Sequence, residues 1–273
     1  METILVPTDF SPAAENAANY AAELAKFFDA KMILINAYSI PPVNYEAGFS
    51  VELLSAVQED SKKQLEDLKK QLLVKNPYLH IDCVSSMGFP VEVINGVAQS
   101  SSADLIVMGI IGEAGKIKEH VIGSSAVKVA RHSDVPTFII PENVKYHRIR
   151  HISLACDMDK TEETVLVYIA KYFSKMFDAD LEIVNVEKPQ DEMSIAKANT
   201  GIFLERKLET IDHKTVFVTE NNAARGLEEY FKTHPTDIIM VNPKKHNVFH
   251  NLFNESVTKE LAFHVKHPIL AIH

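Results

Sequence analysis

Glycine is concentrated in one short stretch of this chain. Between an apolar run at 104–108 and a helix-like segment that begins with Ser124 and Ser125 lie four of the nine glycines, namely Gly109, Gly112, Gly115 and Gly123. Glycine lets a backbone approach a ligand closely, and the free N–H groups at a helix N-terminus attract anions. These residue types in this order therefore predict a phosphate cradle.

Another apolar run is followed by an acidic residue. Asp9 comes directly after the run at 3–7, as Gly109 comes directly after the run at 104–108. In an open parallel sheet, ligands bind beyond the carboxyl ends of the strands. We expect Asp9 to lie across the cleft from the glycines and to accept a hydrogen bond from an amino group or a sugar hydroxyl. The alternative is that the glycines only punctuate loops and the serines only cap a helix. The acid on the neighbouring strand favours the ligand site.

Apolar runs alternate with longer segments of helical periodicity in the first half of the chain. The first such segment has Ser11 placed as its N-cap and Pro12 at its first helical position. Near-continuous apolar strands separated by helices indicate a parallel sheet that is covered on both faces. The predicted strands are 3–7, 31–37, 80–84, 104–108 and 136–140.

The second half repeats this pattern. Segments 150–159, 175–186, 236–242 and 264–272 resemble 3–10, 26–37, 103–109 and 132–140 in turn. The first match places Asp157 where Asp9 stands, and the second shares an asparagine at the strand end, Asn36 and Asn185. We therefore predict an α/β protein with two tandem, doubly wound, open parallel five-stranded sheets that carry helices on both faces. The expected domains are 1–143 and 147–273, joined through the polar segment 141–148.

The repeat is imperfect where the glycines lie. Asn242, Lys245 and Glu255 stand where the first half has Gly109, Gly112 and Gly123, although Ser256 is kept. A carboxylate at the helix N-terminus satisfies the helix dipole itself and repels phosphate. We expect the second half to have lost nucleotide binding.

The composition of the chain argues against several classes of protein. A net charge of −9 argues against non-specific binding to nucleic acid and to anionic membrane surfaces. The two cysteines provide no disulfide framework, and no apolar stretch approaches the roughly 20 residues of a spanning helix. We expect a cytoplasmic protein without nucleic-acid or membrane partners.

Four motifs resemble a known family. They are "ILVPTDFS" (4–11), "GFPVEVI" (88–94), the glycine-rich loop and "VARHSDVPTFII" (129–140). Together they make the chain similar to a tandem protein of the universal stress protein A family, strongly in the first half and weakly in the second. The family signature is Gly-x2-Gly-x9-Gly-(Ser/Thr); here ten residues separate Gly112 from Gly123. The resemblance implies an adenine nucleotide alpha hydrolase-like fold and ATP or AMP as ligand, with Mg as a candidate counter-ion.

The resemblance also implies a set of binding residues in the first half. Adenine is expected against Asp9 and the backbone of Ala37, and the ribose and phosphates along the glycines and the two serines. Lys116 and Lys118 could reach phosphate, although such lysines are more often solvated. The full predicted nucleotide-binding set is Pro7, Thr8, Asp9, Ala37, Met108, Gly109, Gly112, Gly123, Ser124 and Ser125.

Other chemistry-bearing residues form no recognisable set. His246 and His250 have a spacing that ligates metal on a helix, but no acid or cysteine completes the set, so a surface loop is expected. Cys156 is expected to be an ordinary thiol. We assign neither catalytic residues nor metal ligands.

These observations favour a cytoplasmic stress-response protein that binds ATP or AMP in its first domain and acts by nucleotide-dependent signalling or partner binding. One alternative is a slow ATPase or phosphotransfer enzyme, and another is a nucleotide-free dimeric scaffold. The apolar last strands, 136–140 and 268–272, would leave unpaired sheet edges, so we expect them to pair and the chain to form a homodimer.

Overall fold

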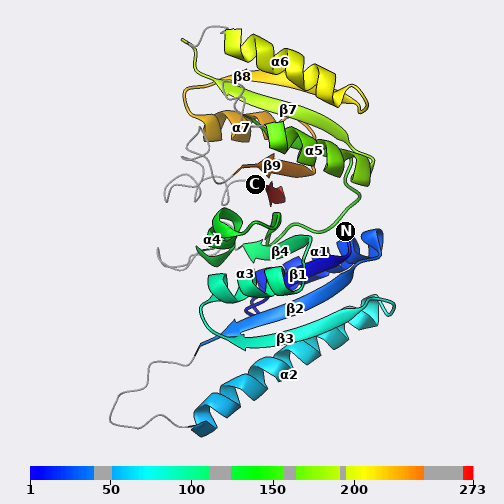
Figure 1. Ribbon diagram of the computed structural model, residues 1–273, viewed down its shortest axis with the longest axis vertical. Coiled ribbons are helices and arrows are strands. Elements are labelled where there is room, and N and C mark those ends of the chain that lie inside the picture. The colour runs from blue at the N-terminus through cyan, green and yellow to red at the C-terminus, as the bar shows by residue number, and fades with distance from the viewer. Residues whose placement is uncertain (40–50, 111–123, 157–163, 191–194, 243–266, 273) are drawn as a thin grey trace. The chain divides into compact units, whose positions relative to one another are not determined.

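The computed structural model describes most of the chain as two compact units (Figure 1). One unit comprises most of residues 1–146, and the other comprises the residues from His147 onward together with Ala130–Asp134. The described residues are 1–39, 51–110, 124–156, 164–190, 195–242 and 267–272. The domain boundaries expected from the sequence, 1–143 and 147–273, remain a prediction.

The first unit is a five-stranded parallel sheet with the order β3-β2-β1-β4-β5. The chain starts in the middle of the sheet, winds outward to β3, and returns to the other side of β1. The point where the winding reverses therefore lies between β1 and β4, and open α/β sheets bind ligands beside such a point. The elements are β1 (Thr3–Pro7), α1 (Pro12–Phe28), β2 (Lys31–Tyr38), α2 (Val51–Lys75), β3 (Ile81–Met87), α3 (Pro90–Ser100), β4 (Leu105–Ile110), α4 (Ser124–His132) and β5 (Thr137–Pro141).

The predicted start of α1 is confirmed in detail. Ser11 is its N-cap, and the Ser11 hydroxyl accepts a hydrogen bond from the Ala14 N–H at 3.3 Å. Pro12 is at the start of the helix, where a backbone N–H has no acceptor within the helix, so the missing N–H of proline costs no hydrogen bond. The helix ends at Asp29, whose backbone takes the left-handed conformation (φ 52°). Local sequence therefore fixes both ends of α1.

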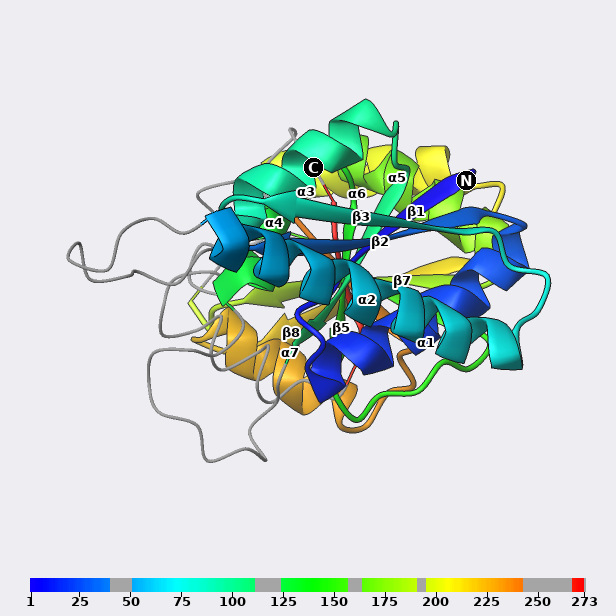
Figure 2. The ribbon, with the colours of Figure 1, turned by 90° about the horizontal axis from the view of Figure 1, so that it is seen from below.

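Helices cover both faces of this sheet (Figure 2). On one face, Ile94 and Ala98 of α3 and Val129 of α4 pack against a layer of side chains that includes Leu5 and Ile33. On the other side of the strands lie α1 and α2. Strands β1, β2, β4 and β5 consist mostly of buried apolar residues because helices cover both faces, whereas the edge strand β3 is largely half-buried and carries polar residues.

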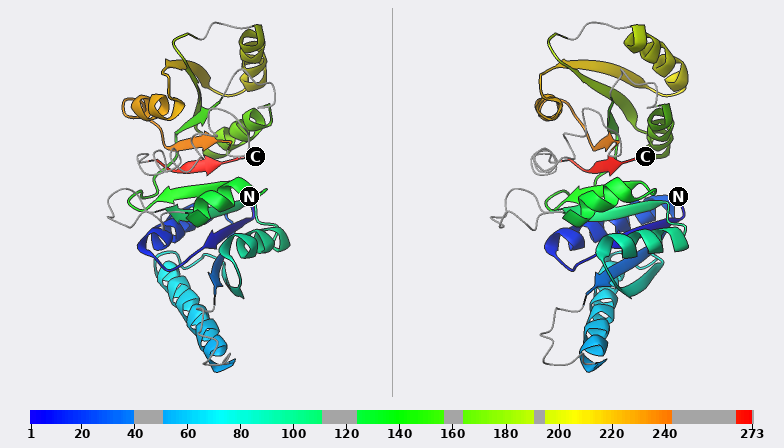
Figure 3. Two further views of the ribbon diagram at one scale, coloured as in Figure 1. Left: turned by 90° about the vertical axis from the view of Figure 1, so that its left-hand side faces the viewer. Right: turned by 60° about the vertical axis from the view of Figure 1, so that its left-hand side comes forward.

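The second unit repeats the topology with the order β10-β9-β6-β7-β8, again parallel throughout. Helices α5 and α6 lie on one side of its strands and α7 on the other (Figure 3). The predicted fold class is thus confirmed in both halves. The elements are β6 (His151–Ala155), α5 (Thr164–Phe177), β7 (Asp180–Glu187), α6 (Ile195–Leu208), β8 (His213–Thr219), α7 (Ala223–Phe231), β9 (Ile238–Val241) and β10 (Ile269–Ala271).

One structural detail recurs in both units. Asp104, directly before β4, accepts hydrogen bonds at Oδ2 from the N–H groups of Glu2 (2.6 Å) and Thr3 (3.0 Å). Asp237, directly before β9, accepts them in the same way from Arg150 (2.7 Å) and His151 (2.9 Å). Each aspartate thereby caps the first strand of its unit, so the second half repeats the first in local geometry as well as in topology.

Candidate functional site

A pocket of about 210 Å³ lies at the carboxyl ends of β1, β2 and β4 in the first unit. This is the sheet edge beside the point where the winding reverses, as the sequence predicts. Seven of the ten predicted binding residues line it together. They are Pro7, Thr8, Asp9, Ala37, Met108, Gly109 and Ser125.

The turn between β1 and α1 carries Asp9 into the pocket. The Thr8 hydroxyl accepts a hydrogen bond from the Phe10 N–H (2.9 Å), and Asp9 Oδ1 accepts one from the Ser11 N–H (3.0 Å). Phe10 has a left-handed backbone (φ 62°), a conformation that costs a residue other than glycine on the order of 1–3 kcal/mol. Asp9 is exposed and lines the pocket, and the turn uses its Oδ1, so the second carboxylate oxygen can serve as an acceptor for a ligand.

Apolar side chains from three elements form the wall of the pocket. Ile35 and Ala37 come from β2, Pro90 and Ile94 from the start of α3, and Met108 from β4. A flat aromatic ring can pack against such a surface, while Asp9 beside it recognises a donor on the edge of the ring. The sequence alone does not indicate Ile35, Pro90 and Ile94 as wall residues, because their place in the wall depends on how α3 packs on β2.

Gly109 has a packing reason to be glycine. A Cβ atom at this position would lie 2.2 Å from the backbone oxygen of Ala13, in the first turn of α1. Real Cβ atoms do not approach a backbone oxygen so closely. Gly109 therefore lets β4 pass close to α1, whereas the sequence analysis explained it by close approach to a ligand.

Helix α4 points its N-terminus at the pocket. Ser125, in its first turn, lines the pocket, and the first turn contains no acidic residue. The unsatisfied N–H groups at a helix N-terminus, together with the helix dipole, favour an anion there. Ser124 begins α4. Gly112 and Gly123 of the predicted set lie outside the described residues, as do Gly115, Lys116 and Lys118.

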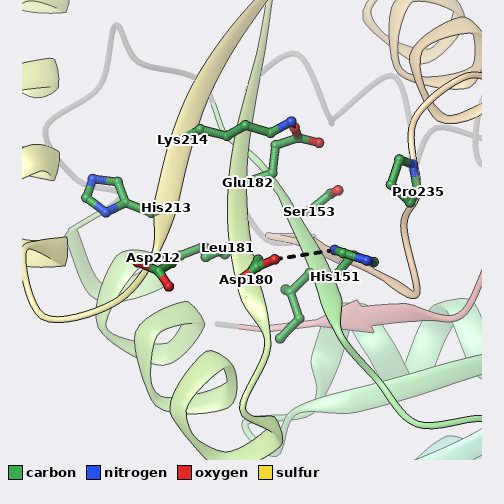
Figure 4. A pocket seen from close by; sticks show the side chains of 10 residues that line it. His151, Ser153, Asp180, Leu181, Glu182, Asp212, His213, Lys214 and Pro235 are labelled. Atoms are coloured by element: carbon green, nitrogen blue, oxygen red, sulfur yellow. Dashed lines mark ion pairs between the residues drawn. The ribbon is translucent and has the colours of Figure 1, made fainter.

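The second unit carries a different pocket, at the opposite, amino-terminal edge of its sheet (Figure 4). It has a volume of about 490 Å³ and is lined by charged side chains, including His151, Asp180, Glu182 and Lys214. The His151 Nδ1 and an Asp180 carboxylate oxygen are 3.7 Å apart. Of the residues that the second half places against the first half's site, Asn242 follows β9, and Asp157, Lys245, Glu255 and Ser256 lie outside the described residues.

Glu182 is the most deeply buried acid of this second pocket. Its side chain is 9% exposed, and its Oε1 contacts the Lys214 ammonium and accepts a hydrogen bond from the Tyr230 hydroxyl at 2.8 Å. Burial and the adjacent Glu182 carboxylate raise the pKa of Tyr230. Since two donors already satisfy the buried carboxylate, this pocket does not by itself indicate a ligand.

Among the described residues, no group of three or more His, Cys, Asp and Glu side chains is arranged to hold a metal ion. His246 and His250 lie outside those residues. Cys156 is buried. In the described part of the chain, no helix has both the length and the apolar character needed to cross a membrane.

Fold and pocket together define a doubly wound α/β protein with a pocket at the carboxyl ends of β1, β2 and β4. The model of the universal stress protein family matches residues 1–141, and the chain belongs to this family. No curated protein matches it by sequence.

Solved structures extend the likeness in fold to the whole chain. A universal stress protein from Archaeoglobus fulgidus DSM 4304 is 17% identical with a TM-score of 0.76, over 99% of this chain and 97% of that one. A protein of unknown function from Pseudomonas aeruginosa PAO1 is 11% identical with a TM-score of 0.62, over 100% and 92%. A universal stress protein in complex with cAMP is 24% identical with a TM-score of 0.40, over 51% and 96%.

Proposed function

We propose that the first unit binds one adenine nucleotide, ATP or AMP, and that the protein acts in the stress response by nucleotide-dependent signalling or partner binding. The observation that carries the proposal is the pocket at the carboxyl edge. It gathers an acid, an apolar wall and a helix N-terminus, which suit an amino-substituted base, its ring and a phosphate.

The base fits the described part of the pocket. A volume of about 210 Å³ is below the roughly 300–1,000 Å³ of pockets for drug-sized ligands, so it suits a base and its sugar. Asp9 accepts the hydrogen bond from the exocyclic amino group of adenine, which guanine does not present at that position. Ile35, Ala37 and Met108 pack against the ring.

The phosphates lie toward the N-terminus of α4. Ser125 and the free N–H groups of the first turn donate to them. Gly112 and Gly123, which lie outside the described residues, stay part of the predicted cradle. Mg is the candidate counter-ion of these phosphates. We assign no base or nucleophile, so binding rather than turnover is the proposed activity.

Nucleotide content tests the proposal directly. Protein purified in buffer without nucleotide is denatured, and the supernatant is analysed for adenine nucleotides. Calorimetry with ATP and AMP then gives the stoichiometry, for which we expect one per chain. A stoichiometry of two contradicts the assignment to the first unit, and the absence of any binding favours the nucleotide-free scaffold.

The chain provides a matched pair of variants. Asp9→Ala removes the acceptor for the base and is expected to weaken ATP binding by about tenfold, the equivalent of one charge-assisted hydrogen bond. Asp157→Ala makes the same change at the equivalent position of the second half and is expected to leave the affinity unchanged. The homodimer and the cytoplasmic location expected from the sequence are part of the same proposal, and light scattering of the purified chain tests the homodimer.

A further inference from the structure

A buried asparagine connects the turn that carries Asp9 to helix α2. Asn36 lies on β2 and is 8% exposed. Its Nδ2 donates to the carbonyl oxygen of Thr8 at 2.7 Å, and its Oδ1 accepts from the Ser61 hydroxyl of α2 at 2.8 Å. Because a carbonyl oxygen can only accept, the amide has one orientation that satisfies both contacts.

The Thr8 carbonyl is the last backbone acceptor before Asp9. Thr8 is already held by its N–H, which donates to the Ile35 carbonyl at 2.8 Å, and by its hydroxyl, which accepts from Phe10. Asn36 adds the third anchor. Phe10, two residues after Thr8, has an unfavourable left-handed backbone conformation. The turn therefore depends on these anchors to keep Asp9 at the pocket.

Ser61 lies at a buried position of α2 where the helical spacing of the other buried residues predicts an apolar residue. The buried stripe of this helix consists of Ser61, Leu65, Leu68 and Leu72, at intervals of four, three and four. A buried hydroxyl is unfavourable unless it is hydrogen-bonded. The single proton of Ser61 goes to Asn36, and the Ser85 hydroxyl of β3 lies 2.7 Å from Ser61 on its accepting side.

The second unit keeps the asparagine, but a different residue lies beside it on the next strand. Asn185 stands at the equivalent position of β7 and is 4% exposed. Its Nδ2 donates to Glu187 Oε1 on the same strand at 3.3 Å. The residue paired with it on β8 is Phe217, whereas Asn36 is paired with Ser85. The unit without the glycine-rich loop therefore lacks a serine at this point.

We propose that Asn36 is a positioning residue of the nucleotide site and that Ser61 couples this site to α2. The inference rests on the proposed nucleotide binding and adds its regulation. A displacement of α2 that separates Ser61 from Asn36 leaves the buried Oδ1 without this donor, loosens the amide that holds the Thr8 carbonyl and thereby weakens nucleotide binding. By linkage, a bound nucleotide stabilises α2 against local opening to the same extent.

The first test compares two isosteric variants. Asn36→Asp replaces the donor to the Thr8 carbonyl with an acceptor, and we expect the dissociation constant of ATP to rise about tenfold or more. Asn185→Asp makes the same change at an equally buried asparagine and controls for a general loss of stability. We expect its ATP affinity to stay within about twofold of wild type. Equal affinities for ATP in wild type and Asn36→Asp overturn the proposal.

Hydrogen exchange gives a second readout that needs no nucleotide. The amides of Phe10 and Ser11 are bonded within the turn, so their exchange reports whether the turn is held. We expect faster exchange of both in Ser61→Ala, a small change that also serves if Asn36→Asp does not fold. If wild type binds no adenine nucleotide, the proposed function fails, and this measurement still decides the inference. Unchanged exchange of Phe10 and Ser11 then overturns it.

Discussion

The two units have the same topology but differ in what fills one layer of the sheet. In the first unit, Leu5 and Ile33 pair in register and belong to an apolar cluster beneath α3. In the second, the equivalent pair is Ser153 and Glu182, and Lys214 follows on the next strand. The framework therefore does not depend on this layer being apolar.

The polar layer is internally satisfied. Glu182 has Lys214 and Tyr230 as donors, and the Ser153 hydroxyl lies 3.0 Å from that of Thr236, where the first unit has Ala103. Exchanging well-packed apolar side chains for a fully paired polar cluster is close to neutral for stability, whereas an unpaired member is costly. The comparison teaches that each unit is held by its strand order and its aspartate cap, while the side chains between them are open to change.

The largest expected effect comes from giving the first unit the loop residue of the second. Gly123→Glu copies Glu255 and places a carboxylate where phosphate is expected. Loss of two charge-assisted hydrogen bonds of roughly 1.5–3 kcal/mol each weakens binding by more than about a hundredfold. Calorimetry with ATP measures the effect. Gly115→Glu, in the same loop but outside the family signature, is the control and should bind ATP normally. Unchanged ATP binding in Gly123→Glu would contradict the assignment of the phosphate site to this loop.

The next effect concerns stability. Gly109→Ala forces a Cβ to within 2.2 Å of the Ala13 oxygen, and the shift of α1 is expected to cost roughly 1–3 kcal/mol in urea unfolding. Gly96→Ala is the control, because its Cβ meets no atom within 4 Å in the middle of α3. That variant should be more stable than wild type by roughly 0.5–1 kcal/mol. Equal stability of the two variants contradicts the packing account of Gly109.

A smaller effect distinguishes the polar layer of the second unit. Burial and the Glu182 carboxylate raise the pKa of the Tyr230 phenol in the folded state. The unfolded chain therefore ionises Tyr230 first, so stability is complete below about pH 10 and is lost as the pH rises above it. In a phenolate absorbance titration, Tyr230→Phe should remove a phase that lies above the pH at which an ordinary tyrosine ionises. Tyr78→Phe, at a residue that is 99% exposed, is the control and should leave that phase in place. Loss of the same phase in both variants argues against the polar layer.

The smallest effect concerns an ion pair whose charges are exchanged between the units. Lys31 and Asp82 pair in the first unit, and the equivalent positions hold Asp180 and Lys214. The hydrogen bond from Lys31 lowers the pKa of Asp82, so its contribution is present above about pH 3.9 and is lost as the pH falls through the folded value. Lys31→Met should cost less than about 1 kcal/mol near neutral pH and nothing in strong acid. A difference that persists in strong acid assigns the effect to packing.

The sequence predicts the fold because the signals for it are local. Apolar strands separated by capped helices specify a parallel α/β unit, and the repeat of Asp104 as Asp237 shows that even strand capping follows the pattern. The strand-end residues of the site follow in turn, since topology alone brings Pro7, Ala37 and Met108 to one edge.

What the sequence did not give depends on contacts between distant elements. Pro90 and Ile94 enter the pocket wall because of how α3 lies on β2, and Gly109 is required by a helix nearly one hundred positions earlier. Two polar residues at buried positions could have indicated such contacts from the sequence. They are Ser61, within a stripe of leucines, and Glu182, within an apolar strand. A polar residue at a buried position of a regular pattern was the clue in each case.

The aspartate cap sets the order in which the first unit can assemble during synthesis. β1 is central, yet its cap, Asp104, lies 102 residues after Glu2, and β4 follows it. Until that segment leaves the ribosome, β1 has β2 on one side and a bare edge on the other, and a bare edge invites pairing with other chains. Long-range parallel pairing is also slow to form. The nascent chain therefore passes through a period in which the centre of its sheet needs protection from aggregation.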